Sequence, residues 1–153
     1  MAANRIRVAK DKAELVKSLV ASKETTGPFQ TYVEVMIFAA ALGAKHKKRV
    51  PLEVISKDLS PLRQEYFTSS FAVLINLLSI TETEDIKILG EDDMADEQRI
   101  HIFEEYANGG LEIIQNELHG AVDYSERLLL LLTSERFEQE NEEEEFNLSK
   151  FLS

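Results

Sequence analysis

The chain has 153 residues, of which 44% are hydrophobic, and this is enough to bury the core of one ordinary domain. It contains no cysteine, which excludes disulfide scaffolds, zinc fingers and thiol catalysis and is typical of a reducing compartment such as the cytoplasm. The formal net charge is −11, but residues 1–66 hold 12 Lys and Arg against 7 Asp and Glu, whereas residues 67–153 hold 5 against 21. A basic half therefore precedes an acidic half.

The first element that we predict is a short strand over residues 4–9. Polar and apolar side chains alternate there, so Ile6 and Val8 should lie on one face of the strand and Arg5 and Arg7 on the other. The start of the fold should therefore present two arginines on the outward face of an extended segment.

A first helix should run from about residue 12 to 23. Asp11 and Glu14 have the spacing of a capping box, and the apolar residues that follow recur at helical spacing. Gly27 and Pro28 should separate this helix from the next, because proline cannot continue a helix and glycine tolerates the conformation that ends one.

The second helix should cover residues 32–42, with Thr31 as its N-cap and Gly43 as its C-cap. Its residues are apolar on nearly every side, so we expect this helix at the centre of the fold. A basic cluster, residues 45–49, follows directly and places four cations in five positions. Favourable interaction with the helix dipole requires fewer cations than that, which makes the cluster a candidate site for binding a polyanion.

Three further helical regions should follow the basic cluster. The Ser60-Pro61 pair is typical of a helix start, and the later part of that helix is strongly apolar. The next helix should begin near residue 93 and be interrupted by Gly109-Gly110 before it resumes. The last helix carries the run Leu128–Leu132, which is too short to span a membrane and suits the centre of a bundle.

These elements predict a mainly α protein, a compact helical bundle with one short N-terminal strand. Residues 1–139 should form a single helical domain, made of the basic half 1–66 and an acidic half 67–139. Residues 140–153 should form an acidic, flexible tail, because residues 138–145 include six glutamates and offer no apolar face. The hydrophobic end of this tail is a candidate partner-binding segment. Its residues are Phe146, Leu148, Phe151 and Leu152.

The N-terminal order of strand, helix, turn and helix resembles a ribbon-helix-helix protomer, in which two chains pair their strands and the ribbon enters the major groove of double-stranded DNA. In such a homodimer the strand arginines would contact bases, while the N-terminus of the second helix and the basic cluster would contact phosphates. The DNA-binding candidates are Arg5, Arg7, Thr31, Lys45, Lys47, Lys48 and Arg49. Two alternatives stay open: the strand packs on the edge of the bundle, and the basic cluster is a solvated loop or pairs with the acidic half of the same chain.

We find no candidate for catalysis or for a cofactor in the sequence. Phosphate loops, dinucleotide fingerprints, nucleophile elbows and metalloprotease motifs are absent. His101 with Glu104 and Glu105 is the one trio that could share a helical face, and such pairs are common on helix surfaces without a metal. We therefore expect a protein that binds a macromolecule, with no metal and no enzymatic activity.

Several blocks of the sequence resemble the family called DNA phosphorothioation-associated protein 4, also known as Dnd system-associated protein 4. The resemblance covers about residues 5–132. The blocks that carry it are Gly27-Pro28-Phe29 and residues 35–43, 45–52 and 102–112. It implies a prokaryotic cytoplasmic protein encoded beside systems that put sulfur into the DNA backbone or that restrict DNA lacking it, and it supplies no catalytic residues.

We therefore expect an accessory, non-catalytic component of a DNA-phosphorothioation-linked modification, restriction and antiviral defence system. Its basic N-terminal half should bind DNA, weakly when alone, or a DNA-bound complex, and its acidic half should bind co-encoded proteins. The alternative is a protein–protein adaptor or regulator with no direct DNA contact. In either case we expect a protein with no cofactor and no membrane-spanning segment.

Overall fold

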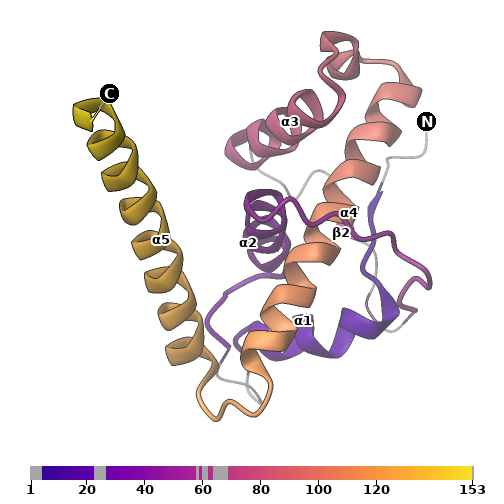
Figure 1. Cartoon of the computed structure of the whole chain (residues 1–153). Helices are drawn as coiled ribbons and strands as arrows, with labels where there is room; N and C mark the ends of the chain where they lie inside the picture. The colour runs from indigo at the N-terminus through magenta and orange to yellow at the C-terminus, as the bar shows by residue number, and fades with distance from the viewer. Residues whose placement is uncertain (1–4, 23–26, 58, 60–61, 64–68, 153) are drawn as a thin grey trace. The chain divides into compact units, whose positions relative to one another are not determined.

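The computed structural model describes residues 5–22, 27–57, 59, 62–63 and 69–152, with the backbone alone at 63, 69–70 and 144–152. The chain forms two compact units, Met1–Gln115 and Asn116–Ser153. Over the described residues it is mainly helical, as predicted, with five α-helices and short strands (Figure 1). None of the described helices combines the length and the apolar composition that crossing a membrane requires.

The predicted N-terminal strand is present as β1, Arg5–Ile6. Ile6 and Val8 are buried, whereas Arg5 and Arg7 are exposed, so the predicted alternation is confirmed. The partner of β1 is β2, Leu62–Arg63, which runs antiparallel to it within the same chain. The sequence left open whether this strand pairs with its copy in a second chain or packs on the edge of the bundle. Because its apolar face lies in the core of its own unit, the strand instead takes a partner from that unit.

The first two helices begin close to their predicted positions, but α1 ends four residues before its predicted end and α2 three residues after. A short 3-10 helix, η1, covers Lys10–Lys12 and leads into α1, Ala13–Leu19. The helix α2 covers Tyr32–Lys45, and the Thr31 hydroxyl accepts a hydrogen bond from the Glu34 N–H, at 3.2 Å, as the predicted N-cap should. Gly43, the predicted C-cap, lies inside α2 and is buried.

The acidic half of unit 1 contains α3, Ser69–Thr83, a 3-10 helix η3, Ile86–Leu89, and the long helix α4, Asp93–Leu118. The predicted helix start at Ser60 and Pro61 lies outside the described residues. The predicted interruption at Gly109-Gly110 was wrong, because α4 continues through both glycines.

Close approach of α2 and α4 explains the glycines within both helices. A Cβ on Gly110 would lie 1.7 Å from the Ala39 carbonyl oxygen, and a Cβ on Gly43 would lie 2.1 Å from the Tyr106 carbonyl oxygen. Both distances are far below van der Waals contact, so the two backbones can be this near only where side chains are missing. The glycines therefore serve helix packing, and this is why they neither interrupt α4 nor end α2.

The core of unit 1 draws on β1, α1, α2 and α4. Ile6 comes from β1, Leu19 from α1, Met36 from α2 and Phe103 from α4, and all four are almost completely buried. Elements from both ends of this unit thus share one hydrophobic core, as expected for a compact helical fold.

Unit 2 consists of the end of α4, a turn and α5, Tyr124–Leu152. Gly120 adopts a φ of 75° in the turn, and the Asp123 side chain accepts a hydrogen bond from the Glu126 N–H at the start of the helix, at 3.2 Å. The helix α5 continues through the acidic residues 138–145 and into the segment 140–153 that we predicted to be a flexible tail. Glutamate has a high helix propensity, so an acidic composition alone does not end a helix. The division at residues 139 and 140 stays a prediction.

Candidate functional site

The basic cluster, residues 45–49, follows α2 as a tight turn. Lys47 has a φ of 52°, in the left-handed region, and the Lys48 N–H donates to the Gly43 carbonyl oxygen at 2.8 Å. The chain then runs onto α4, where the Val50 N–H donates to the Glu105 carbonyl oxygen at 3.1 Å. This turn brings the end of the basic cluster against the acidic helix α4.

Arg49 lies at the centre of a network of charged side chains. Its Nε donates to Glu105 Oε1 at 2.6 Å, and its Nη1 donates to Glu82 Oε1 at 2.7 Å. The Tyr106 hydroxyl donates a short hydrogen bond to the same Glu82 carboxylate. His101 lies one helical turn before Glu105, with its Nε2 3.5 Å from Glu105 Oε1. Arg49 thus joins α3 to α4 through two carboxylates.

The pKa values in this network follow from its geometry. Burial of the Arg49 guanidinium opposes its charge, but the hydrogen bonds that it donates to Glu82 and Glu105 outweigh burial and raise the pKa of Arg49. The hydrogen bond from Tyr106, and after it that from Arg49, lowers the pKa of Glu82. Burial, together with the bond to the Glu82 carboxylate, raises the pKa of Tyr106 to about 12. Each shift favours the protonation state that keeps the network intact.

Lys48 makes a weaker contact with the same helix. Its Nζ lies 3.4 Å from Glu112 Oε1, and both side chains are about one third exposed. Exposed ion pairs of this kind contribute about 0–1 kcal/mol to stability. The contact therefore adds little energy, although it does bring a second α4 carboxylate next to a cation of the basic half.

Arg7 forms the most deeply buried of these pairs, with Glu104 of α4. The guanidinium donates from Nε to Glu104 Oε2 and from Nη2 to Oε1, both at 3.1 Å, and the Arg7 backbone N–H donates to Oε2 at 2.6 Å. The Glu104 side chain is 1% exposed and that of Arg7 is 48% exposed. The hydrogen bonds to Glu104, followed by its negative charge, raise the pKa of Arg7. This two-pronged geometry is the strongest that an arginine and a carboxylate can form.

The structure thus brings three of the predicted DNA-binding residues, Arg7, Lys48 and Arg49, to carboxylates of α4. Thr31 uses its hydroxyl as the cap of α2. The remaining candidates, Arg5, Lys45 and Lys47, are exposed.

Sequence analysis missed the carboxylates that hold these cations. We interpreted Glu104 and Glu105 as part of a solvated helix surface, yet they are 1% and 7% exposed. A signal was present in the sequence, because apolar residues flank the pair on both sides, Ile102-Phe103 before it and Tyr106-Ala107 after it. Such a pattern is typical of a helix buried on every side, where carboxylates need partners.

The predicted partner-binding residues lie in the last turns of α5, and their side chains are outside the described part of the chain. They are Phe146, Leu148, Phe151 and Leu152. Within the part that the structure does describe, no three His, Asp or Glu side chains are placed to hold a metal ion. The charged groups around α4 described above bind one another.

Comparison with known proteins gives a match over nearly the whole chain. A family described as DNA sulphur modification system-associated protein 4 matches residues 5–151. No curated protein and no solved structure matched the sequence. The match extends beyond the blocks identified above and includes most of α5.

Proposed function

Because the chain belongs to the family of DNA sulphur modification system-associated protein 4, we propose that it is a non-catalytic accessory protein of such a system, in which it binds a protein partner through α5. The family places the chain in a role associated with DNA sulphur modification. The kind of molecule that it binds there is the part that we infer from the residues.

The observation that carries this proposal is the run Leu128–Leu132 in α5. Successive residues of an α-helix are about 100° apart, so five consecutive leucines occupy every side of the helix. Whichever side packs within the protein, leucines remain on the others, and Leu129 and Leu130 are 64% and 55% exposed. Exposed apolar surface of this kind is typical of a site that binds another protein.

The charge of α5 indicates the kind of partner. The helix carries eight glutamates against three Lys and Arg, and most of the glutamates follow the leucine run. A partner that fits it would offer an apolar groove with basic residues near one end, the arrangement by which amphipathic helices are commonly bound. Co-encoded proteins of the modification system are the natural candidates.

Contacts of the basic half favour this protein-binding role over direct DNA contact. Arg7 and Arg49 pair with Glu104 and Glu105, which are buried. Transfer of either arginine to a DNA phosphate would leave a buried carboxylate without its cation, at a cost of about 3–5 kcal/mol. Direct DNA contact is the second candidate function, and the exposed cations of the basic half favour it. They are Arg5, Lys45 and Lys47.

Co-purification from the native host tests the first proposal. We expect the full-length protein to retain co-encoded proteins after nuclease treatment, and to lose them when Leu129 and Leu130 are both replaced by glutamine. The matched control replaces Ile86 and Met94, which are 78% and 73% exposed in unit 1, by glutamine. Loss of the partners on nuclease treatment would favour the DNA candidate, and equal retention by both variants would refute a role of α5.

A further inference from the structure

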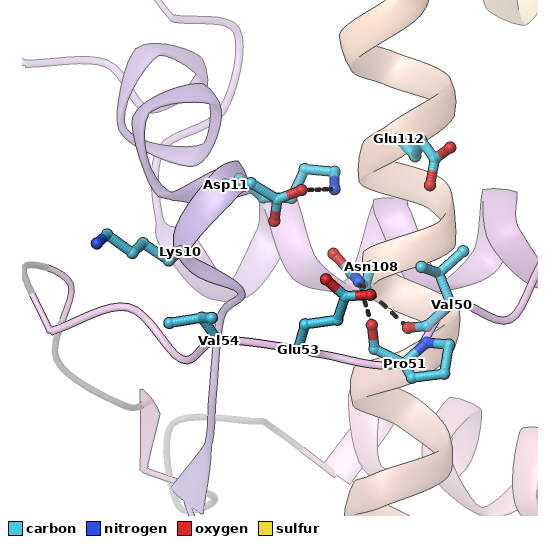
Figure 2. A pocket seen from close by; sticks show the side chains of 9 residues that line it. Lys10, Asp11, Val50, Pro51, Glu53, Val54, Asn108 and Glu112 are labelled. Carbon is cyan, nitrogen blue, oxygen red and sulfur yellow. Dashed lines mark hydrogen bonds and ion pairs between the residues drawn. The ribbon is translucent and has the colours of Figure 1, made fainter.

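A pocket of about 520 Å³ lies within unit 1, between η1, residues 50–54 and α4 (Figure 2). Its volume is in the range of small-molecule sites, roughly 300–1,000 Å³. Three segments that are far apart in the sequence form its walls. The lining residues are Lys10, Asp11, Lys12, Val50, Pro51, Glu53, Val54, Asn108 and Glu112.

Hydrogen bonds hold the walls in place. The Lys10 N–H donates to the Val54 carbonyl oxygen at 2.8 Å, which ties η1 to one end of the segment 50–54. At the other end, Asn108 Nδ2 donates to the carbonyl oxygens of Val50 and Pro51, at 3.2 and 3.3 Å (Figure 2). The pocket is therefore a built part of the fold.

Two buried polar groups line this pocket with bonding capacity to spare. Lys12 is 3% exposed, and its ammonium, which has three N–H donors, pairs with Asp11 at 2.8 Å. Asn108 is 4% exposed, and its Oδ1 accepts no hydrogen bond from any described residue. The two carbonyl oxygens at Nδ2 fix which end of the amide is the oxygen. Buried groups of this kind are rare without a partner, and they often mark a binding site.

The remaining lining defines the shape and charge of a ligand. Val50, Pro51 and Val54 offer apolar surface for a flat body. Lys10 and Lys12 face three carboxylates, and Glu112 already pairs with Lys48. The lining thus carries no excess of positive charge, and a neutral ligand suits it better than a phosphate.

We propose that this pocket binds a small neutral heterocycle with a carbonyl next to a ring N–H, the edge found in nucleobases of the uracil type. The carbonyl oxygen accepts from Lys12, the ring N–H donates to Asn108 Oδ1, and the ring lies against Pro51. Oδ1 is shielded from water, so the ligand reaches it past the exposed side chains of Glu53 and Val54, which can change rotamer. The proposal is independent of the role of α5.

Titration of the full-length protein with uridine, followed by ligand-observed nuclear magnetic resonance, tests the idea. We expect uridine to bind, and 3-methyluridine, which lacks the ring N–H, to bind at least about tenfold more weakly. Uridine 5′-monophosphate should bind no more tightly than uridine, because its phosphate would face Glu53 and Glu112. Absence of uridine binding, equal affinity for the methylated nucleoside, or tighter binding of the monophosphate would overturn the proposal.

Two variants locate the binding within this pocket. Lys12→Met removes the ammonium and keeps a stem of similar length, and it should weaken uridine binding about tenfold. Val54→Trp, at the wall, should have a similar effect without touching the core, since Val54 is 56% exposed. The matched control is Val73→Trp on α3, where the valine is 55% exposed and lies outside the pocket. Uridine binding that survives Val54→Trp as fully as it survives Val73→Trp would refute this location.

Discussion

Replacement of Arg7 by alanine should destabilise the protein by about 3 kcal/mol. Glu104 accepts three hydrogen bonds from Arg7, and alanine would keep the one from the backbone N–H. The carboxylate, 1% exposed, would then lie in the interior without its cation. We place the cost at the lower end of the range for a broken buried pair, because the guanidinium itself is half exposed. In a chain of this length the melting temperature should fall by about 6–12 °C.

Denaturation in urea and thermal melts followed by circular dichroism would measure this loss. Arg5→Ala is the matched control, because Arg5 is exposed two residues before Arg7 and forms no ion pair with a described side chain, so its loss should stay within about 0.5 kcal/mol. Arg7→Lys should recover only part of the loss, since lysine cannot form the two-pronged contact. If Arg7→Ala costs no more than Arg5→Ala, Arg7 is not held by α4 and its guanidinium is available to contact DNA.

Three further outcomes are expected. The pKa of Tyr106 is raised from 10.0 to about 12, so its contribution to the free energy of unfolding is full below pH 10 and is lost as the pH rises toward 12. Urea denaturation at alkaline pH should therefore show a smaller loss of stability for Tyr106→Phe than for the wild type, and equal losses would contradict a hydrogen-bonded Tyr106. Gly110→Ala would force a Cβ to within 1.7 Å of the Ala39 carbonyl oxygen, so it should cost about 1–3 kcal/mol or more, and an unchanged melting temperature would show that the two helices are not in contact. Fluorescence anisotropy with duplex DNA should give a plot of log K against log salt no steeper than about −3 per protomer if only the exposed candidates Arg5, Lys45 and Lys47 contact phosphates, because each phosphate contributes about −0.9. A steeper slope would mean that cations paired with α4 leave those ion pairs to contact DNA.

The sequence by itself determined the local features of this protein. The alternation at residues 4–9 predicted a strand with Ile6 and Val8 inside, and helical spacing with the Thr31 cap predicted α2. Each of these signals comes from residues that are close together in the sequence, so the strand and the helix can be predicted without knowledge of what packs against them. Several blocks of the sequence also resembled the family to which the chain belongs.

Contacts between distant segments were decided by the tertiary structure alone. Arg7 and Glu104 are 97 residues apart, and nothing near either residue indicates the other. The local sequence predicted a helix break at Gly110, whereas in the structure this glycine allows the backbone of α4 to approach Ala39 of α2. A charged side chain can bind a ligand or pair within the protein, and a glycine can end a helix or allow two helices to approach. The local sequence does not distinguish these roles, because the free energy of each depends on the groups that surround the residue in space. The sequence left open whether the basic cluster binds a polyanion or pairs with the acidic half of the same chain, and only the tertiary structure showed that Lys48 and Arg49 contact carboxylates of α4.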